Sequence, residues 1–191
     1  CILLGMSTFS VFGFIDIVET EQNYESIKYM KENNYINGFS DGSFRPNDYL
    51  SGNQFAVLLI NISGVTDFEY KVSERNWAES YLIYVNDKEW LGYNELPAYR
   101  PDLSSQNITR EKAMKGLFNA LGLKVPNYKL LNKPFIDLSE CSQDEHRDIL
   151  VSASILGLIL ISFKTSVSGS IIANAFIFSL ESADVYLRSL L

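Results

Sequence analysis

The chain has few of the residues that build metal centres and disulfide frameworks. Its 191 residues include one histidine, His146, and two cysteines, Cys1 and Cys141. Zinc sites draw most of their ligands from these two residue types, so the sequence favours no metal site and we expect no cofactor. Two cysteines define no disulfide framework. Acidic and basic neighbours surround His146, which is typical of a solvated helix face.

Basic residues and long apolar runs are also scarce. The 16 lysines and arginines face 23 acidic residues, which gives a net charge of −7. A nucleic-acid-binding protein needs a basic surplus to displace counterions from phosphates, so we expect no such partner. The apolar run at residues 149–163 ends short of the roughly 20 residues of a membrane span. It favours a buried helix that breaks near Gly157, and no transmembrane span is expected.

Common enzyme motifs are missing as well. The sequence contains no Gly-x-Ser-x-Gly elbow, no P-loop and no His-Glu-x-x-His. A carboxylate pair for glycoside cleavage could exist among 23 acids, but the sequence singles out no such pair. We therefore expect that the chain is not an enzyme.

Residues 1–13 are uncharged and mostly apolar. Val11 and Gly13 take positions −3 and −1 of a cleavage site before Phe14, as in the second half of a secretory signal peptide. The alternative is a buried N-terminal helix or strand. We interpret this segment as a signal peptide remnant, which predicts an exported protein.

The remaining chain contains an internal repeat. Three apolar helical patterns follow one another at intervals of 58 and 59 residues. In each, an aliphatic residue precedes a serine or threonine whose hydroxyl suits a helix N-cap. The three starting pairs are Leu50-Ser51, Ile108-Thr109 and Val167-Ser168.

A second landmark supports the same period. The tripeptide Phe-Ile-Asp occurs at Phe14 and Phe135, followed each time by an acidic stretch and a helical pattern. Asp16 and Asp137 within it are expected to cap the helices that follow. One such unit is too small to bury its own apolar face. The sequence thus predicts a mainly α fold of three helix-loop-helix repeats sharing one core, at residues 14–66, 67–128 and 129–191.

The loop inside each unit carries an aromatic residue followed by a basic one. The pairs are Phe44-Arg45, Tyr99-Arg100 and Phe163-Lys164. We expect the aromatic ring to anchor the loop to the core. Pro46 and Pro101 are expected to keep the backbone extended ahead of the next helix. The basic residue could be a donor to a ligand in a groove or a staple from loop to helix. Asp41 suits a turn, with a ligand contact as the alternative.

These motifs together resemble the S-layer homology domain. The first unit carries "FIDI", "YINGFSDGSFRP" and "LSGNQFA", the second "YRP" and "ITREKA", and the third "FIDL" and "ILGLI". The resemblance implies a pseudo-threefold helical assembly that anchors an exported bacterial protein to the cell envelope without a covalent bond. The implied ligand is an anionic, often pyruvylated, secondary cell wall polysaccharide held in grooves between repeats. The implied location is extracellular, at the cell wall or S-layer.

The resemblance also implies a leading ligand contact, the arginine of the family's Thr-Arg-Ala-Glu motif. Here that arginine is Arg110, and the matching positions in the other units are Gly52 and Gly169. A guanidinium offers a carboxylate two parallel donors, and a helix start adds free amides. A solvated Arg110, or an ion pair with Glu111, is the structural alternative. The predicted ligand-binding residues are Arg110, Thr109, Arg45, Arg100, Asp41, Ser51, Lys164 and Ser168.

Two interpretations stay open at this point. Exposed aromatic rings could stack on sugars, although rings at helical spacing usually belong to a core. The candidates are Trp77, Trp90, Tyr93 and Tyr99. The chain could also be a degenerate repeat unit that serves as a structural or protein-interaction module, with self-association through residues 149–180.

Overall fold

The computed structural model describes residues 13–20 and 24–123. These residues form five helices and contain no β-strand, which confirms the predicted mainly α fold. The helices are α1 (Tyr24–Glu32), α2 (Gly52–Ser63), α3 (Glu79–Asp87), α4 (Pro101–Ser104) and α5 (Arg110–Ala120). The third predicted repeat lies outside the described residues, so the threefold arrangement and the repeat boundaries stay predictions.

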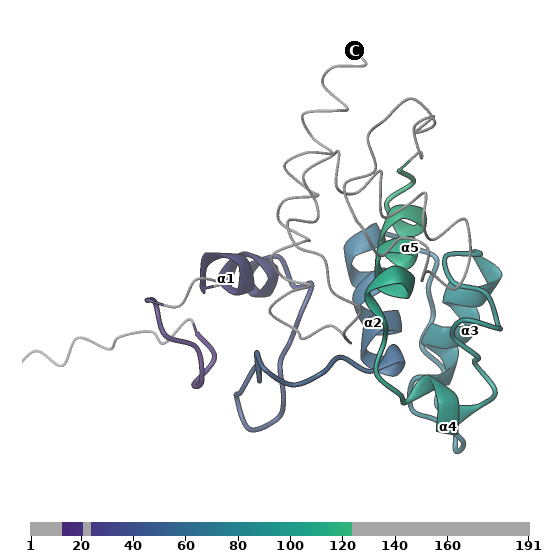
Figure 1. Ribbon diagram of the computed structural model, residues 1–191, viewed down its shortest axis with the longest axis horizontal. Coiled ribbons are helices and arrows are strands. Elements are labelled where there is room, and N and C mark those ends of the chain that lie inside the picture. Colours follow the sequence, from purple (N-terminus) through teal and green to yellow (C-terminus); the bar gives the residue numbers. More distant parts are fainter. Residues whose placement is uncertain (1–12, 21–23, 124–191) are drawn as a thin grey trace, which may run out of the picture.

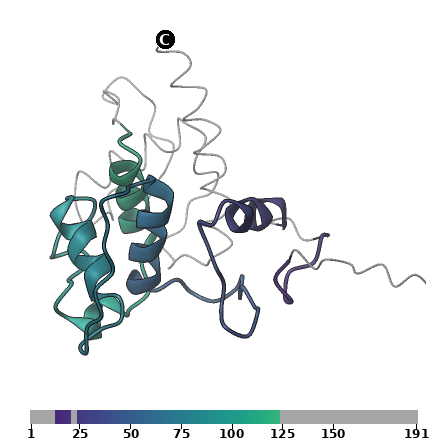
Figure 2. The ribbon, with the colours of Figure 1, turned by 180° about the vertical axis from the view of Figure 1, so that it is seen from behind.

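Helix α1 is a short amphipathic helix that stands to one side of the other four (Figures 1 and 2). Ile27 and Met30 lie one turn apart and are both buried. Glu25 in the first turn and Lys31 in the last turn complement the helix dipole. The helix lies where the sequence pattern predicts it.

Helix α2 is the centre of the described core. It packs against both α3 and α5, and Figure 1 shows it beside α5. A helix that is apolar on most of its surface needs partners on more than one side, and most residues of α2 are buried. It ends at Gly64, whose left-handed φ of 67° suits glycine.

A glycine lets α5 approach α2 closely. A Cβ atom added at Gly116 would lie 2.9 Å from Cε1 of Phe55 and 3.0 Å from Cδ1 of Leu59. The two helices therefore pack almost backbone to side chain at this point. The largest fully buried side chains around this contact and elsewhere in the core are Phe55, Phe118, Ile27, Met30, Leu59, Leu82, Leu91 and Val85.

Pro46 lies in a turn and Pro101 at a helix start, whereas the sequence predicts extended backbone at both. Pro101 is the first residue of the four-residue helix α4, where its fixed φ and missing N–H are favourable. Pro46 follows Arg45 in a turn closed by a hydrogen bond from the Asp48 N–H to the Arg45 carbonyl oxygen, at 3.1 Å. This is the second position of a β-turn, which also favours proline. The expectation of extended backbone at these two positions is wrong.

Within residues 13–20 and 24–123, no helix has the length and apolar character needed to cross a membrane.

Candidate functional site

The starts of α2 and α5 lie side by side. An isolated antiparallel bridge pairs Ser51 with Asn107. The Ile108 N–H donates to the Leu50 carbonyl oxygen at 2.8 Å, and the Gly52 N–H donates to the Gln106 carbonyl oxygen at 2.9 Å. The backbone ahead of each helix is thus joined to its counterpart. Three predicted site residues, Ser51, Thr109 and Arg110, are thereby brought together from segments almost sixty residues apart.

The two helix starts are capped differently. Ser51 forms a full capping box with Gln54, since its hydroxyl accepts from the Gln54 amide and the Gln54 side chain accepts from the Ser51 N–H. Thr109 is the N-cap residue of α5 by position, but its hydroxyl makes no capping bond. The prediction of a side-chain cap is confirmed at Ser51 and wrong at Thr109. The third residue of α5 is Lys112, which cannot accept a bond and instead donates to the Glu95 carbonyl oxygen at 3.1 Å.

The hydroxyl of Thr109 is left in an unusual environment. Its Oγ1 atom is buried and has no hydrogen-bond partner among the described residues. A buried hydroxyl without a partner costs free energy, so this hydroxyl adds no stability to the start of α5. Arg110 follows directly as the first residue of α5 and is half-buried.

Gly52, which matches Arg110 in the first unit, has no room for a side chain. A Cβ atom there would lie 2.3 Å from Cδ1 of Leu96 and 2.7 Å from the carbonyl oxygen of Ser104. The start of α2 is therefore packed against Leu96 and the last residue of α4, Ser104. The missing arginine reflects a close backbone approach, and the described chain has its motif arginine at α5 alone.

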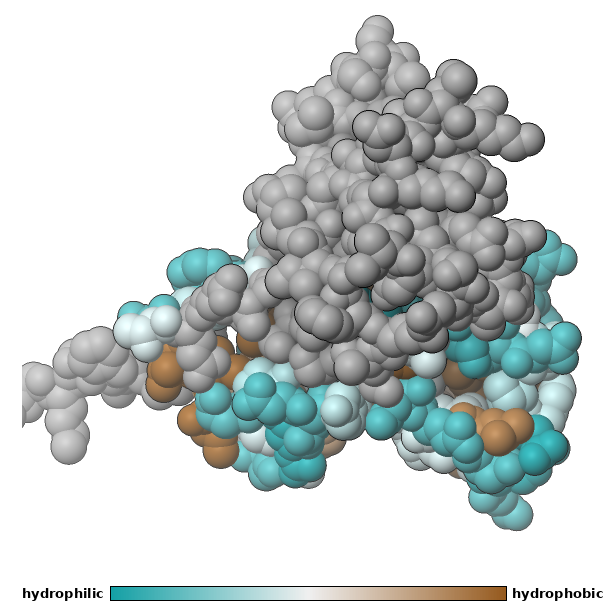
Figure 3. Space-filling view, viewed as in Figure 1, coloured by the Kyte–Doolittle hydropathy of each residue, from teal (hydrophilic) through white to brown (hydrophobic). Residues whose placement is uncertain are grey.

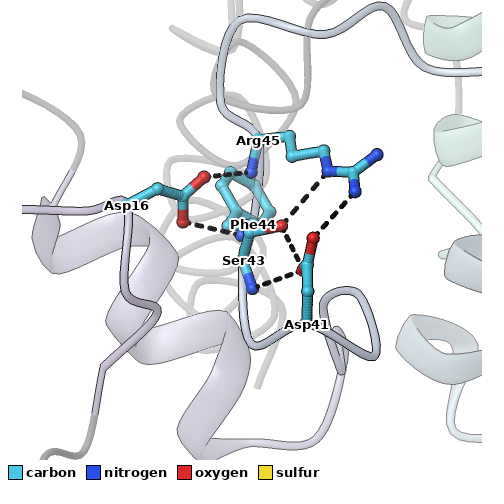
Figure 4. A network of polar contacts seen from close by, with 5 residues as sticks. All are labelled: Asp16, Asp41, Ser43, Phe44 and Arg45. Carbon is cyan, nitrogen blue, oxygen red and sulfur yellow. Dashed lines mark hydrogen bonds and ion pairs between the residues drawn. The ribbon is translucent and has the colours of Figure 1, made fainter.

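The loop between α1 and α2 is held by two carboxylates (Figure 4). Asp16 accepts hydrogen bonds from the backbone N–H groups of Phe44 and Arg45, at 2.8 and 2.7 Å. Asp41 accepts from the Ser43 N–H at 3.0 Å, from the Ser43 hydroxyl at 2.6 Å and from the Arg45 guanidinium at 2.9 Å. Asp16 clamps this loop instead of capping α1, which begins only at residue 24. Its predicted role as a helix cap is wrong.

Arg45 is a staple within its own loop. Besides the Asp41 contact, its Nε donates to the Ser43 hydroxyl at 3.2 Å, and its guanidinium carbon lies 4.0 Å from the centre of the Phe39 ring. The Asp41 hydrogen bond raises the pKa of Arg45. Hydrogen bonds from Ser43 first, and then from Arg45, lower the pKa of Asp41 well below its usual range. Asp41 is the turn-former that the sequence favours.

Arg100 is also engaged locally. Its Nε and Nη2 donate to the two carboxylate oxygens of Asp102 at 3.0 and 2.9 Å. This bidentate hydrogen bonding raises the pKa of Arg100 and lowers that of Asp102. Arg45 is therefore paired inside its own loop, and Arg100 is paired with the first turn of the adjoining helix α4. Lys164 and Ser168, like Asp137, lie outside the described residues.

The aromatic residues that directly precede these two arginines in the sequence differ in burial. Phe44 is half-buried and stacks on Phe14, with ring centroids 5.3 Å apart, so it anchors its loop as predicted. Tyr99 is exposed and stacks on Tyr93, with ring centroids 6.1 Å apart and ring planes 5° apart. It does not reach the core, and the anchor prediction is wrong for Tyr99.

An open groove of about 280 Å³ lies between this loop, α2 and Trp77. The loop supplies Tyr35–Phe39 and Phe44–Leu50 in part, and α2 supplies a face of apolar and amide side chains. The lining residues include Tyr35, Asn37, Phe39, Phe44, Arg45, Asp48, Tyr49, Gln54, Asn61 and Trp77. Of the tryptophans, Trp77 is 54% exposed and Trp90 only 8%. The described part of the face in Figure 3 is mostly hydrophilic, with separate apolar patches.

Sequence reasoning named Arg45 and Trp77 but missed Tyr49, Asp48 and the amide residues of the groove. Those residues belong to a loop and a helix whose mutual placement no local motif reveals. Trp77 was the one residue that could have pointed to the groove. It lies just ahead of α3 and does not fall in register with the buried residues of that helix.

Comparison with known families supports the resemblance. Residues 13–56 match the family model of the S-layer homology domain. The match runs from the start of the first unit into the beginning of α2, so this segment is similar in sequence to the S-layer homology domain. It does not determine the number of repeats. No curated protein matches the chain.

The family defines the general role of the matched segment. S-layer homology domains are binding domains and are not catalytic, and in general they attach proteins to the cell surface through a wall polymer. The match therefore indicates association with the cell surface or S-layer.

Proposed function

We propose that the chain anchors an exported bacterial protein to the cell envelope by non-covalent binding of an anionic secondary cell wall polysaccharide, whose acidic groups are pyruvate ketals. The observation that carries this proposal is the S-layer homology match at residues 13–56. The location that follows is extracellular, at the cell wall or S-layer.

Arg110 is the residue we propose for the acidic group. It stands at the start of α5, where free backbone amides and the positive end of the helix dipole favour an anion. The buried Thr109 hydroxyl beside it has no partner among the described residues. A ketal carboxylate could take two donors from the guanidinium and others from the backbone amides at the helix start. Because the chain carries a net charge of −7, attraction to an acidic polymer must come from such local groups.

The proposal is tested by sedimentation with purified cell walls. The wild-type chain should sediment with the walls and be released by soluble wall polysaccharide. Arg110→Ala should stay in the supernatant while keeping its helical circular dichroism. A wild-type chain that ignores wall material at low salt would contradict the proposal.

A second function is favoured by a specific observation. Arg45 and Arg100 are already paired with acids, and Gly52 leaves no space for an arginine. A degenerate unit that acts as a structural or self-associating module would show this pattern. It predicts a dimer or larger species in light scattering and no response of the chain to Arg110→Ala. A monomer that binds walls would exclude it.

A further inference from the structure

We infer that the groove lined by Trp77, Tyr49 and Arg45 binds an uncharged sugar unit of the wall polymer, while the acidic units are recognised elsewhere. This inference rests on the proposed wall-polymer binding and assigns a ligand class to one groove. It is argued from the charge, the aromatic exposure and the amide groups of the lining residues.

The charged groups of the groove give it no positive surplus that would favour an anion. Its described lining contains one basic residue, Arg45, and one acidic residue, Asp48. The guanidinium of Arg45 already binds Asp41 at 2.9 Å and Ser43 at 3.2 Å, and it lies over the Phe39 ring. An incoming carboxylate would share the single positive charge of Arg45 with Asp41 and would also face Asp48. Burial of a like charge beside two carboxylates is unfavourable, so the groove discriminates against acidic sugars.

The start of α2 carries no counterpart of Arg110. The helix that forms one wall of the groove is α2, and its first residue is Gly52. The carbonyl oxygen of Ser104 would lie 2.7 Å from any Cβ atom at that position. A side chain with a positive charge cannot be placed there without moving backbone. The start of α2, which does not itself line the groove, therefore differs in charge from the start of α5, where Arg110 stands.

The neutral groups that remain suit a sugar. Trp77 is 54% exposed and Tyr49 is 59% exposed, although both border the same groove. Exposed rings with one polar end offer an apolar face for a sugar ring and a donor at the rim. The cap uses only the carbonyl oxygen of the Gln54 side chain, so its NH₂ group can donate to a hydroxyl. Asn37 is exposed at the rim and offers both a donor and an acceptor.

The size of the groove also fits a small neutral unit. Its volume of about 280 Å³ lies just below the range of roughly 300–1,000 Å³ for small-molecule sites. Such a groove holds one or two sugar rings and leaves the rest of a polymer chain outside. A chain of alternating neutral and acidic units could then reach both this groove and Arg110.

The experiment follows the two tryptophan indole N–H signals of the full chain by NMR. The probes are soluble wall polysaccharide in its native acidic form and the same polysaccharide after reduction of its carboxylates to alcohols. Trp77 should shift with both probes, and its shift with the reduced probe should survive a rise from about 30 to 300 mM salt, because no ion pair is involved. Trp90, which is 8% exposed, is the internal control and should not move.

Variants extend the test. Trp77→Ala should weaken binding of the reduced polysaccharide about tenfold, whereas Trp77→Phe should keep part of the stacking. Tyr99→Ala removes an exposed ring that does not line the groove and should have no effect. A Trp77 shift that appears only with the acidic probe, or a shift with the reduced probe that disappears with salt, would overturn the inference.

The outcomes separate this inference from the proposed function. If Trp77 stays unshifted while Arg110 is needed for binding the acidic probe, the neutral groove is wrong and wall binding stands. If Trp77 responds to the reduced probe while Arg110→Ala changes nothing, the groove stands and acidic recognition by Arg110 is wrong. If neither probe binds, both are wrong.

Discussion

At the scale of single residues, the loop cations are neutralised by acids a few positions away. Arg45 is paired with Asp41 and Arg100 with Asp102. All four residues can be read from the sequence. Their ion pairs could not be predicted, because the spacing rules for side-chain pairs hold within a regular helix and not in these loops. Arg45 also has a left-handed φ of 60°. The hydrogen bonds from the backbone N–H groups of Phe44 and Arg45 to the Asp16 carboxylate help to hold this conformation. That conformation depends on a residue 29 positions earlier.

The pH dependence of the loop follows from Asp41. Donors from Ser43 and Arg45 lower the pKa of its carboxyl in the folded chain. A lowered folded-state pKa stabilises the fold above about pH 4, the ordinary value, and the stabilisation is lost as pH falls from there toward the folded-state pKa. The difference in urea midpoint between wild type and Asp41→Asn should therefore be full at pH 7 and shrink steadily below pH 4.

Asp48→Asn is the matched control for this measurement. Asp48 lies in the same loop and is exposed, and its side chain accepts no hydrogen bond within the described part of the chain. Its urea midpoint should follow that of the wild type at every pH. An Asp41→Asn difference that is equally large at pH 7 and pH 2.5 would show that the carboxylate charge is unimportant.

The two cap residues give a second prediction at this scale. Ser51→Ala removes a capping box and should lower the free energy of unfolding by about 1 kcal/mol. Thr109→Val removes a buried hydroxyl that has no partner among the described residues, so stability should be unchanged or rise by up to about 1 kcal/mol. Chemical denaturation of both variants measures the contrast. An equal loss in the two variants would mean that Thr109 stabilises its helix after all.

At the scale of the elements, hydrophobic periodicity predicted α1, α2, α3 and α5 correctly, because each buries a face with helical spacing. The short helix α4 was missed. Four residues carry no periodicity, and only its initial proline marks it. The close approach of Gly52 in α2 to Ser104 in α4 could not be predicted either. A glycine in a helical pattern can have several structural causes, and the sequence does not tell them apart.

Gly52 supplies the prediction for this scale. Alanine is the better helix former by about 1 kcal/mol, yet its Cβ would collide with the Ser104 carbonyl oxygen. Gly52→Ala should therefore destabilise the chain by about 1–3 kcal/mol. Gly116→Ala meets only side-chain atoms of Phe55, Leu59 and Leu91, which can move, so it should cost less. Thermal denaturation of the two variants tests this order, and the reverse order would contradict the packing described here.

At the scale of the whole molecule, the sequence predicted the helical class and the similarity of residues 13–56 to the S-layer homology domain, since both depend on local patterns. The groove beside Trp77 was not predictable, because it requires the mutual placement of a loop, α2 and a residue ahead of α3. The side-by-side helix starts that bring Thr109 close to Ser51 are likewise a tertiary feature. The predicted threefold assembly and the roles of Lys164 and Ser168 stay predictions.

The central claim is that Arg110 binds an acidic wall glycan, and its most direct test is calorimetric titration with native soluble wall polysaccharide. Arg110→Gln should weaken binding at least about tenfold, as expected for loss of a charged bidentate contact. Lys71→Gln removes one positive charge from a side chain that is 75% exposed, and its affinity should stay within about twofold of wild type. Equal affinities of Arg110→Gln and wild type would contradict the account.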